Sequence, residues 1–272
     1  MVRHILQTHI ITILFLLLIA PAANSQNFEA VSKPSADIIL SFVKPGRISE
    51  VPIKEGDLVR NGGLLAKQED RLELIRVKML KAQADDETQI KATEAELEQK
   101  KKNLGKLEEA LQKGAATDWE TDHARLEVET TGIALEKARL DHEQNIRRHL
   151  EASIEYDHLH LFSPIAGYVE EVKIEVGESV QAFDPVIRVV QTDPLLIDVP
   201  VPVPLASQLS KNQPALVTFL LGNAQNGDQV AEGKVENIGA VAEAASNTLR
   251  VRIKVPNPQK RPAGERVTIA FP

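Results

Sequence analysis

Few residues of this chain have the types and spacing that chemistry requires. His158 and His160 stand two positions apart, a spacing that would place both rings on one side of a strand, as paired metal ligands are placed. The alternative, which we favour, is a pair of surface histidines at a joint between domains. The sequence has no Gly-rich phosphate loop, no His-Glu-x-x-His pair and no nucleophile elbow. We therefore expect no catalytic residue, no cofactor and no metal site.

The composition excludes further classes of site. The 272 residues include no cysteine, which rules out disulfides, thiolate metal sites and a cysteine nucleophile. Only two methionines are present, and one of them is Met1, so no methionine cluster for a soft metal exists. A formal net charge of −7 and 4% aromatic residues argue against nucleic acid as a partner.

The first 25 residues have the pattern of an export signal. Arg3 supplies a short positive region, and the apolar run from Ile10 to Ala20 is too short to span a bilayer comfortably. Small residues then lead to an expected cleavage before Gln26, with a cut after Ala22 as a second site. The alternative is an uncleaved membrane anchor. In either case we expect an exported protein.

Proline distribution predicts a long helical segment in the middle of the chain. No proline occurs between Pro52 and Pro164, and the stretch is rich in Ala, Glu, Lys, Leu and Gln. Two apolar series recur every seven residues, a period typical of helices that wind around each other: Ile90, Leu97, Leu104 and Leu111, then Trp119, Leu126, Ile133 and Leu140. We expect helices at about 70–113 and 118–155.

The two expected helices should fold back on each other as an antiparallel hairpin, with both apolar series in the seam. For Trp119, a position outside the seam, in contact with a partner, is the alternative. Gly114 suits the end of the first helix, and Thr117 with Glu120 three residues later suits a capping box that starts the second.

An internal repeat lies on either side of this hairpin. The segments 46–59 (GRISEVPIKEGDLV) and 167–180 (GYVEEVKIEVGESV) match at a constant offset of 121 residues. Each alternates apolar and polar residues and would form a strand, a turn and a strand. We predict that the halves combine into a two-layer β-sandwich with pseudo-twofold symmetry. The repeated glycines are candidate structural turn residues, and Gly56 and Gly177 are expected to have positive φ; the set is Gly46, Gly56, Gly167 and Gly177.

These half-motifs resemble the lipoyl/biotinyl-carrier fold. In that family a β-turn between the halves bears a modified lysine, whereas here the hairpin begins at that place and Arg71 occupies it. Lys67 is nearby, inside an expected strand. A lipoyl or biotin carrier subunit of an enzyme is therefore kept as an alternative of another class.

A lipoyl-like domain split by a helical hairpin, behind a signal peptide, resembles the periplasmic adaptor (membrane fusion protein, HlyD-like) family. The resemblance covers about 40–272 and includes Leu161-Phe162-Ser163-Pro164 before Ile165-Ala166-Gly167. It implies that the hairpin tip binds a partner, although Lys106 replaces the usual Arg, Thr117 takes a Ser-like place and Leu111 is one residue off the usual spacing. The implied tip residues are Lys106, Leu111, Gly114, Ala115 and Thr117.

The expected fold class is therefore α+β, multidomain and elongated. The predicted parts are a signal peptide (1–25), an N-terminal linker (26–40), two lipoyl-like halves (41–69 and 158–192), the coiled-coil hairpin (70–157) and an antiparallel β-barrel of five or six strands (193–272). From the resemblance we also expect a short variant, without the further membrane-proximal domain of many adaptors.

The resemblance implies a periplasmic adaptor without catalysis of its own. Its expected partners are an inner-membrane transporter, RND-type more readily than ABC-type, an outer-membrane channel, and further copies of itself in a ring, a hexamer or a trimer of dimers. The alternative within the family is an adaptor of an ABC-type exporter or a type I secretion system.

Overall fold

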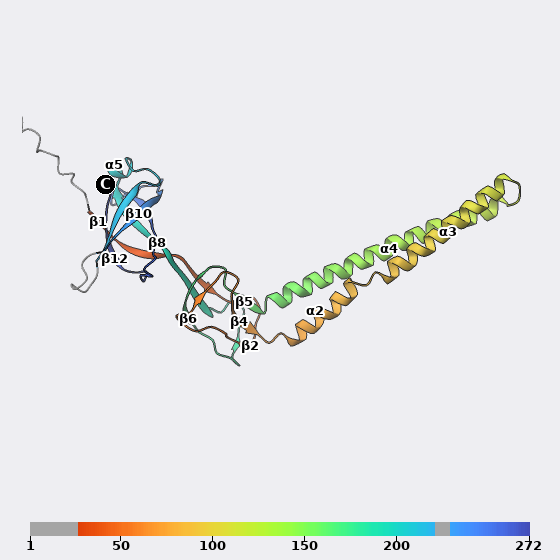
Figure 1. Ribbon diagram of the computed structural model, residues 1–272, viewed down its shortest axis with the longest axis horizontal. Helices are drawn as coiled ribbons and strands as arrows, with labels where there is room; N and C mark the ends of the chain where they lie inside the picture. Colours follow the sequence, from red (N-terminus) through yellow and green to blue (C-terminus); the bar gives the residue numbers. More distant parts are fainter. Residues whose placement is uncertain (1–26, 221–228) are drawn as a thin grey trace, which may run out of the picture. The chain divides into compact units, whose positions relative to one another are not determined.

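The computed structural model describes residues 27–220 and 229–272, and the predicted signal segment at 1–25 lies outside them. The described chain divides into two compact units, one formed by the residues up to Asp37 with Val190–Pro272 and the other by Ile38–Val189 (Figure 1). None of the described helices has the length and apolar character needed to cross a membrane.

The first unit is a closed, six-stranded antiparallel barrel. The strand order is β1-β12-β9-β10-β11-β8, and an additional β1–β8 pairing closes the ring. Closure removes the free sheet edges. The short helix α5 (Val203–Ala206) follows β8. The strands are β1 (Asn27–Leu40), β8 (Ile187–Pro202), β9 (Pro214–Phe219), β10 (Gln229–Ile238), β11 (Thr248–Val255) and β12 (Arg266–Ala270).

Period-two alternation builds the barrel core. Leu195, Ile197, Val199 and Val201 follow one another along β8 and are fully buried, while the residues between them lie on the other face of the strand. Their partners across the β8–β11 ladder include the equally buried Val251, Ile253 and Val255. Apolar side chains from every second position therefore fill the barrel.

The expected linker at 26–40 is wrong for the residues described, because 27–40 form β1. This strand pairs with β12, in a register that places Asn27 opposite Ala270 and Val31 opposite Arg266. Ser32 adds two contacts, since its N–H donates to the Glu265 carbonyl at 2.9 Å and its hydroxyl accepts from the Glu265 N–H at 3.1 Å. The sixth barrel strand thus comes from the opposite end of the chain.

The second unit contains a small β-structure and three helices. One four-stranded sheet has the order β5-β4-β2-β7, and β3 pairs with β6. A buried apolar cluster that includes Phe42, Ile48, Leu65 and Val169 forms its core. The strands are β2 (Gly46–Glu50), β3 (Leu58–Val59), β4 (Leu64–Gln68), β5 (His160–Phe162), β6 (Gly167–Val172) and β7 (Ser179–Val180).

Hydrogen bonds between the repeated segments follow the 121-residue offset. The Gly56 N–H donates to the Val169 carbonyl at 2.8 Å, and the Gly177 N–H donates to the Ile48 carbonyl at 2.8 Å. At this offset Val169 is equivalent to Ile48, and Gly177 is equivalent to Gly56. The two hydrogen bonds are therefore related by the pseudo-twofold symmetry of the repeat. The pairing of Val59 with Gly167 is likewise repeated by that of Gly46 with Val180. The two half-motifs therefore exchange identical contacts.

The acidic residue after each turn glycine has a structural role that is the same in both halves. The Asp57 carboxylate accepts from the Lys54 N–H at 2.8 Å, and the Glu178 carboxylate accepts from the Glu175 N–H at 3.0 Å. Each carboxylate thus accepts a hydrogen bond from a backbone N–H within its own turn, as side chains of turn residues commonly do. This local bond accounts for the shared acidic position.

The turn glycines lie where the sequence places them, with φ of +87° at Gly56 and +95° at Gly177. An L side chain is strained in this region, so glycine is required. Gly46 and Gly167 differ from the expectation of turn residues, because they are the first residues of β2 and β6. At Gly46 the requirement is space, since a Cβ would lie 2.7 Å from Gln68 Cδ.

Three helices form the hairpin: α2 (Arg71–Ala84), α3 (Thr88–Gln112) and α4 (Asp118–Asp157) (Figure 1). The single helix expected at 70–113 is therefore interrupted after Ala84. The Asp86 carboxylate accepts from the Thr88 N–H at 2.9 Å, which starts α3 anew. Hydrogen bonds from the Thr88 hydroxyl and N–H lower the pKa of Asp86. Two successive aspartates at 85–86 thus favour a helix boundary over continuation.

Candidate functional site

The helical hairpin is the candidate site for partner binding, and ion pairs fix its antiparallel register. Glu94 pairs with Arg139 at 2.6 Å, Lys100 with Glu127 at 3.0 Å and Glu108 with Arg125 at 3.3 Å. The residue numbers rise on α3 as they fall on α4, so the helices run in opposite directions. Each exposed pair contributes well under about 1 kcal/mol, and together they specify register more than stability.

Small residues and one leucine occupy the α4 side of the seam. Thr121, Ala124, Thr131, Leu135 and Ala138 are buried, at spacings of three, four and seven residues. The Thr131 hydroxyl donates to the Glu127 carbonyl at 2.8 Å, so it needs no partner across the seam. Small side chains let the two helices approach closely. The α3 side carries the first predicted series, whose members are half-buried: Ile90, Leu97, Leu104 and Leu111.

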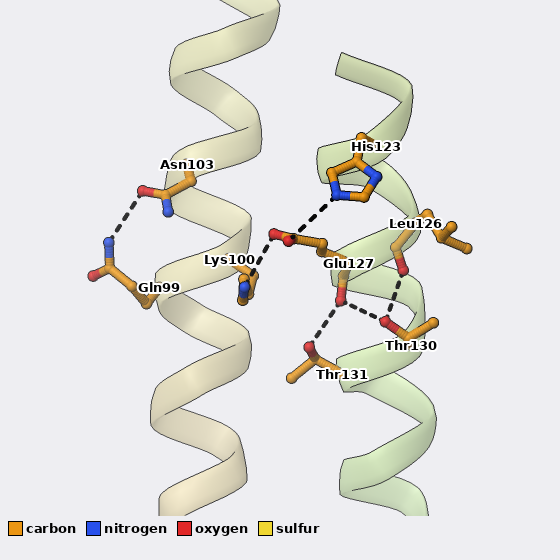
Figure 2. Close-up of polar contacts among 8 residues, drawn as sticks. All are labelled: Gln99, Lys100, Asn103, His123, Leu126, Glu127, Thr130 and Thr131. Atoms are coloured by element: carbon orange, nitrogen blue, oxygen red, sulfur yellow. Dashed lines mark hydrogen bonds and ion pairs between the residues drawn. The ribbon is translucent and has the colours of Figure 1, made fainter. Parts of the chain in front are cut away.

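The prediction that the second apolar series lies in the seam is wrong. Trp119 is 73% exposed, Leu126 55%, Ile133 61% and Leu140 50%. Figure 2 shows Leu126 pointing away from α3, whereas the next residue, Glu127, points toward it. Two rows of residues on α4 repeat every seven positions. The row of mostly small residues is the one that packs against α3. The other row, which we call the α4 stripe (Trp119, Leu126, Ile133 and Leu140), faces solvent in the isolated chain.

The tip of the hairpin is a tight turn between two well-capped helix ends. Gly114 has φ of +69°, its N–H donates to the Leu111 carbonyl at 2.9 Å, and the Ala115 N–H donates to the Ala110 carbonyl at 2.8 Å. These two bonds form a Schellman motif, which requires a left-handed residue at the position of Gly114. The backbone therefore satisfies its own carbonyls and leaves Ala115 exposed.

Thr117 starts α4 through the capping box that the sequence predicts. The Glu120 N–H donates to the Thr117 hydroxyl at 3.3 Å, and the Thr117 N–H donates to the Glu120 carboxylate at 2.8 Å. The Thr117 hydroxyl also donates to that carboxylate, at 2.8 Å. The two hydrogen bonds that the Glu120 carboxylate accepts lower its pKa, and the bond from the Thr117 backbone N–H has the larger effect. The hydroxyl proton is thus already engaged, and a partner would meet an acceptor rather than a donor.

The structure brings most of the predicted tip residues together. Gly114, Ala115 and Thr117 are exposed in and beside the turn, and Leu111 is half-buried one turn before it. Lys106 is exposed on α3 but lies eight residues before Gly114, about 12 Å along the helix at 1.5 Å per residue. Four residues therefore share the tip, and Lys106 belongs to the shaft.

Two further exposed apolar rows, which we call the root rows, were missed from the sequence. Leu72, Ile75 and Met79 on α2 are 77%, 64% and 54% exposed, and Leu150 and Ile154 on α4 are 58% and 47% exposed. An ion pair between Arg76 and Glu155 at 3.1 Å places both rows at the same level of the hairpin. The alternating spacing of three and four from Leu72 to Met79 was the signal available for the α2 row.

The two histidines of the opening motif have different surroundings. His158 is the exposed C-terminal cap of α4, whereas the His160 ring contacts Asp70 and the Tyr156 carbonyl. Within 27–220 and 229–272, no group of three or more His, Cys, Asp or Glu side chains is arranged to hold a metal ion. The two histidines are close in the sequence because His158 ends α4 and His160 begins β5.

Comparison with known proteins adds to this geometry. Residues 195–265 match the family model described as CusB-like, beta-barrel domain. No curated protein is similar enough in sequence to count as a relative. Among solved structures, MacA from Actinobacillus actinomycetemcomitans is similar with a TM-score of 0.71 and 16% identity, over 91% of this chain and 78% of that one.

Two further solved structures share the fold. The membrane fusion protein Spr0693 from Streptococcus pneumoniae R6 has a TM-score of 0.60 and 15% identity, over 91% of this chain and 99% of that one. A putative efflux transporter from Bacteroides eggerthii DSM 20697 has a TM-score of 0.56 and 18% identity, over 90% and 68% of the two chains. The resemblance to the periplasmic adaptor, or membrane fusion protein, family is therefore confirmed, with a CusB-like β-barrel and an adaptor-type arrangement of strands and helices.

Proposed function

We propose that this chain is the periplasmic adaptor subunit of a tripartite efflux pump, in which it bridges an inner-membrane transporter to an outer-membrane channel. The observation that carries the proposal is the order of its parts, a helical hairpin inserted between two symmetry-related β-motifs and followed by a CusB-like barrel. The structural similarity to MacA over 91% of the chain supports the same proposal. Export by the signal segment at 1–25 would deliver the protein to the periplasm.

The parts receive family roles under this proposal. The symmetric β-structure, with halves at 41–69 and 158–192, is a lipoyl-like domain, and the hairpin at 70–157 is a coiled coil. The barrel at 193–272, completed by β1, is the domain that stacks toward the transporter. The matching family model has RND in its name, which supports an RND-type transporter over an ABC-type exporter.

The tip residues are proposed to contact the channel. Ala115 is exposed, and its small side chain would let a partner helix approach closely. Thr117 and Gly114 hold the turn through backbone bonds that a partner need not supply. The contact would therefore be made by a preformed tip, with little ordering cost on binding.

The exposed apolar rows are proposed to contact neighbouring copies of this chain. The α4 stripe repeats every seven residues, which fits a second helix packed along it, because two helices that wind around each other repeat their contacts at that interval. The root rows on α2 and α4 are different surfaces at the same level, so one copy's α2 row can meet the next copy's α4 row. Contacts between two different surfaces generate a ring when the rotation closes.

A carrier function has less support. Lys67 lies within β4 and pairs with Asp70 at 3.0 Å, with only 27% of its side chain exposed. A lysine that carries a swinging cofactor must stand free at a turn. We therefore propose assembly without covalent chemistry, and the intact mass of the purified protein should show no added lipoyl or biotin group.

The proposal is tested by placing a charge at the tip. Ala115→Glu should keep the wild-type melting temperature, because the site is an exposed turn, and should abolish export in a strain that lacks the wild-type gene, because an unpaired charge enters a packed interface. Ala95→Glu, at an exposed position in the middle of α3, is the matched control and should export normally. Normal export by a folded Ala115→Glu variant would contradict docking through the tip.

A further inference from the structure

The seam along α4 has a gap in its burial. Every residue of α4 is described, and five of them up to Ala138 are buried, but the next buried residue is Ala152. The seam positions continue through the gap, because His142 and His149 follow Leu135 at intervals of seven residues. Two half-buried histidines therefore stand where apolar residues would complete the seam.

This gap lies opposite the junction between α2 and α3. On one side of the gap Arg139 pairs with Glu94 of α3 at 2.6 Å, and on the other side Glu155 pairs with Arg76 of α2 at 3.1 Å. The α4 residues between these pairs therefore face the part of the first arm that contains the helix boundary at 85–87. Figure 1 shows α2 and α3 as two separate helices along α4. The seam thus weakens at the level at which the first arm of the hairpin is interrupted.

The two histidines in the gap have unsatisfied ring nitrogens. Nδ1 of His142 and Nδ1 of His149 are buried and have no hydrogen-bond partner. In the part of the seam formed with α3, by contrast, the hydroxyls of Thr93 and Thr131 each donate to a backbone carbonyl one turn earlier, at 2.9 Å and 2.8 Å. A buried polar atom without a partner destabilises the packed state, because it has lost its hydrogen bonds to water. Counting back six residues from Glu155 places His149 opposite the last turns of α2, so the α2–α4 contact bears this cost.

The apolar contacts that hold α2 against α4 are few. Ala84 is the only buried residue of α2, all of whose residues are described, while Leu74, Val77 and Leu80 on its inner side are half-buried. The apolar residues of its outer side, which form one of the root rows, are exposed. Opening α2 would therefore expose little further apolar surface. The ion pair that links α2 to α4 is solvent-exposed and contributes little.

We propose that α2 is a strap that opens by itself, leaving α4 while α3 and α4 remain paired. Because α2 ends at Ala84 and α3 begins at Thr88, α2 can lose its hydrogen bonds without breaking those of α3. The opening stops at Asp70, whose carboxylate pairs with Lys67 of β4 at 3.0 Å. The closed and the open strap are therefore two states of one helix within an otherwise intact hairpin.

The strap sets how firmly the hairpin is attached to the β-structure of the second unit. With the strap closed, two packed helices connect the hairpin to the β-structure. With the strap open, α4 is the one helical connection and residues 71–87 become a tether, so the shaft of the hairpin can pivot on a single helix. This property belongs to the chain before any partner binds, and it does not depend on the identity of the transporter or the channel.

Hydrogen exchange of the purified wild-type protein, followed by mass spectrometry, tests whether the strap opens by itself. After correction for intrinsic rates, the amides of 77–84 in α2 should exchange at least about tenfold faster than those of 93–104 in α3, because a unit that opens alone exchanges through its own opening equilibrium. Equal protection of the two segments would overturn the proposal, because the hairpin would then open as one unit. That outcome would leave the proposed function standing, since docking through the tip is tested separately.

A pair of matched variants tests the cause of the opening. His149→Leu replaces the unsatisfied ring by an apolar side chain and should slow exchange of 77–84 by about tenfold, while 93–104 keeps its wild-type rate. His123→Leu makes the same change at an exposed position of α4, controls for the higher helix propensity of leucine, and should leave 77–84 unchanged. If His149→Leu slows both segments equally, or slows neither, the proposal is wrong.

Discussion

The orientation of α4 predicts unequal costs for two truncations only two residues apart. Leu135 is 7% exposed in the seam, and Ile133 is 61% exposed on the α4 stripe. Ile133→Ala removes side-chain burial worth about 1 kcal/mol at most, given about 1.5–3 kcal/mol for a fully buried side chain. Alanine's higher helix propensity returns roughly 0.4 kcal/mol of this. The net destabilisation should be below about 0.6 kcal/mol.

Leu135→Ala should cost several times more. A buried leucine truncated to alanine loses about 2–5 kcal/mol, and the thin seam of a two-helix hairpin should lie near the lower limit. Thermal unfolding followed by circular dichroism at 222 nm reports mainly on the hairpin, because the other described helix has only four residues. Equal shifts of the melting temperature for the two variants, or a larger shift for Ile133→Ala, would refute this orientation of α4.

Three further predictions concern the turns and the barrel. Gly56→Val should destabilise the β-structure by roughly 1–3 kcal/mol of backbone strain, because the residue has φ of +87°, and a melting temperature equal to that of the wild type would disprove the need for glycine. Thr117→Ala should lower hairpin stability by about 1 kcal/mol through loss of the cap, measured by urea titration, with Thr117→Ser as the control that restores it. The hydrogen bond from Arg252 lowers the pKa of Asp198 from its ordinary 3.8, so the stability that this pair contributes is present above that pH and is lost as the pH falls below it. Exchange protection of the β11 amides should therefore drop in acid in the wild type and less so in Asp198→Asn, and equal acid sensitivity would contradict the role of the pair.

Local patterns predicted much of the fold. The antiparallel barrel expected at 193–272 is found and includes β10 and β11, because the strand pattern of apolar and polar residues is a property of each segment alone. The capping box at Thr117 and the left-handed glycines at 56 and 177 were predictable for the same reason. Each depends on residues within a few positions of one another.

Features that depend on distant partners were not predictable. β1 resembles a linker until β12 is placed beside it, and no local signal connects these ends of the chain. On α4 both a row of small residues and a row of large apolar residues repeat every seven positions, so periodicity alone could not decide which row faces α3. The greater hydrophobicity of the α4 stripe favoured the wrong choice.

The candidate site shows the same division. The sequence located the tip through its glycine and its cap, but the exposed rows on the shaft emerge only when the seam is known. From the sequence we favoured two surface histidines at a joint between domains, which is correct for His158 but not for His160, whose side chain is only 11% exposed. The neighbour of His160 is Asp70, which the sequence could not indicate because the whole hairpin separates the two residues.

Site-specific photo-crosslinking in living cells tests most directly whether the protein joins components of two membranes, as proposed. A benzophenone side chain at Ala115 samples the hairpin tip, and one at Val241, which is 84% exposed, samples the barrel. Mass spectrometry of the crosslinked products should identify an outer-membrane channel from Ala115 and an inner-membrane transporter from Val241. Products that contain no membrane protein from either position would contradict the assignment as an adaptor.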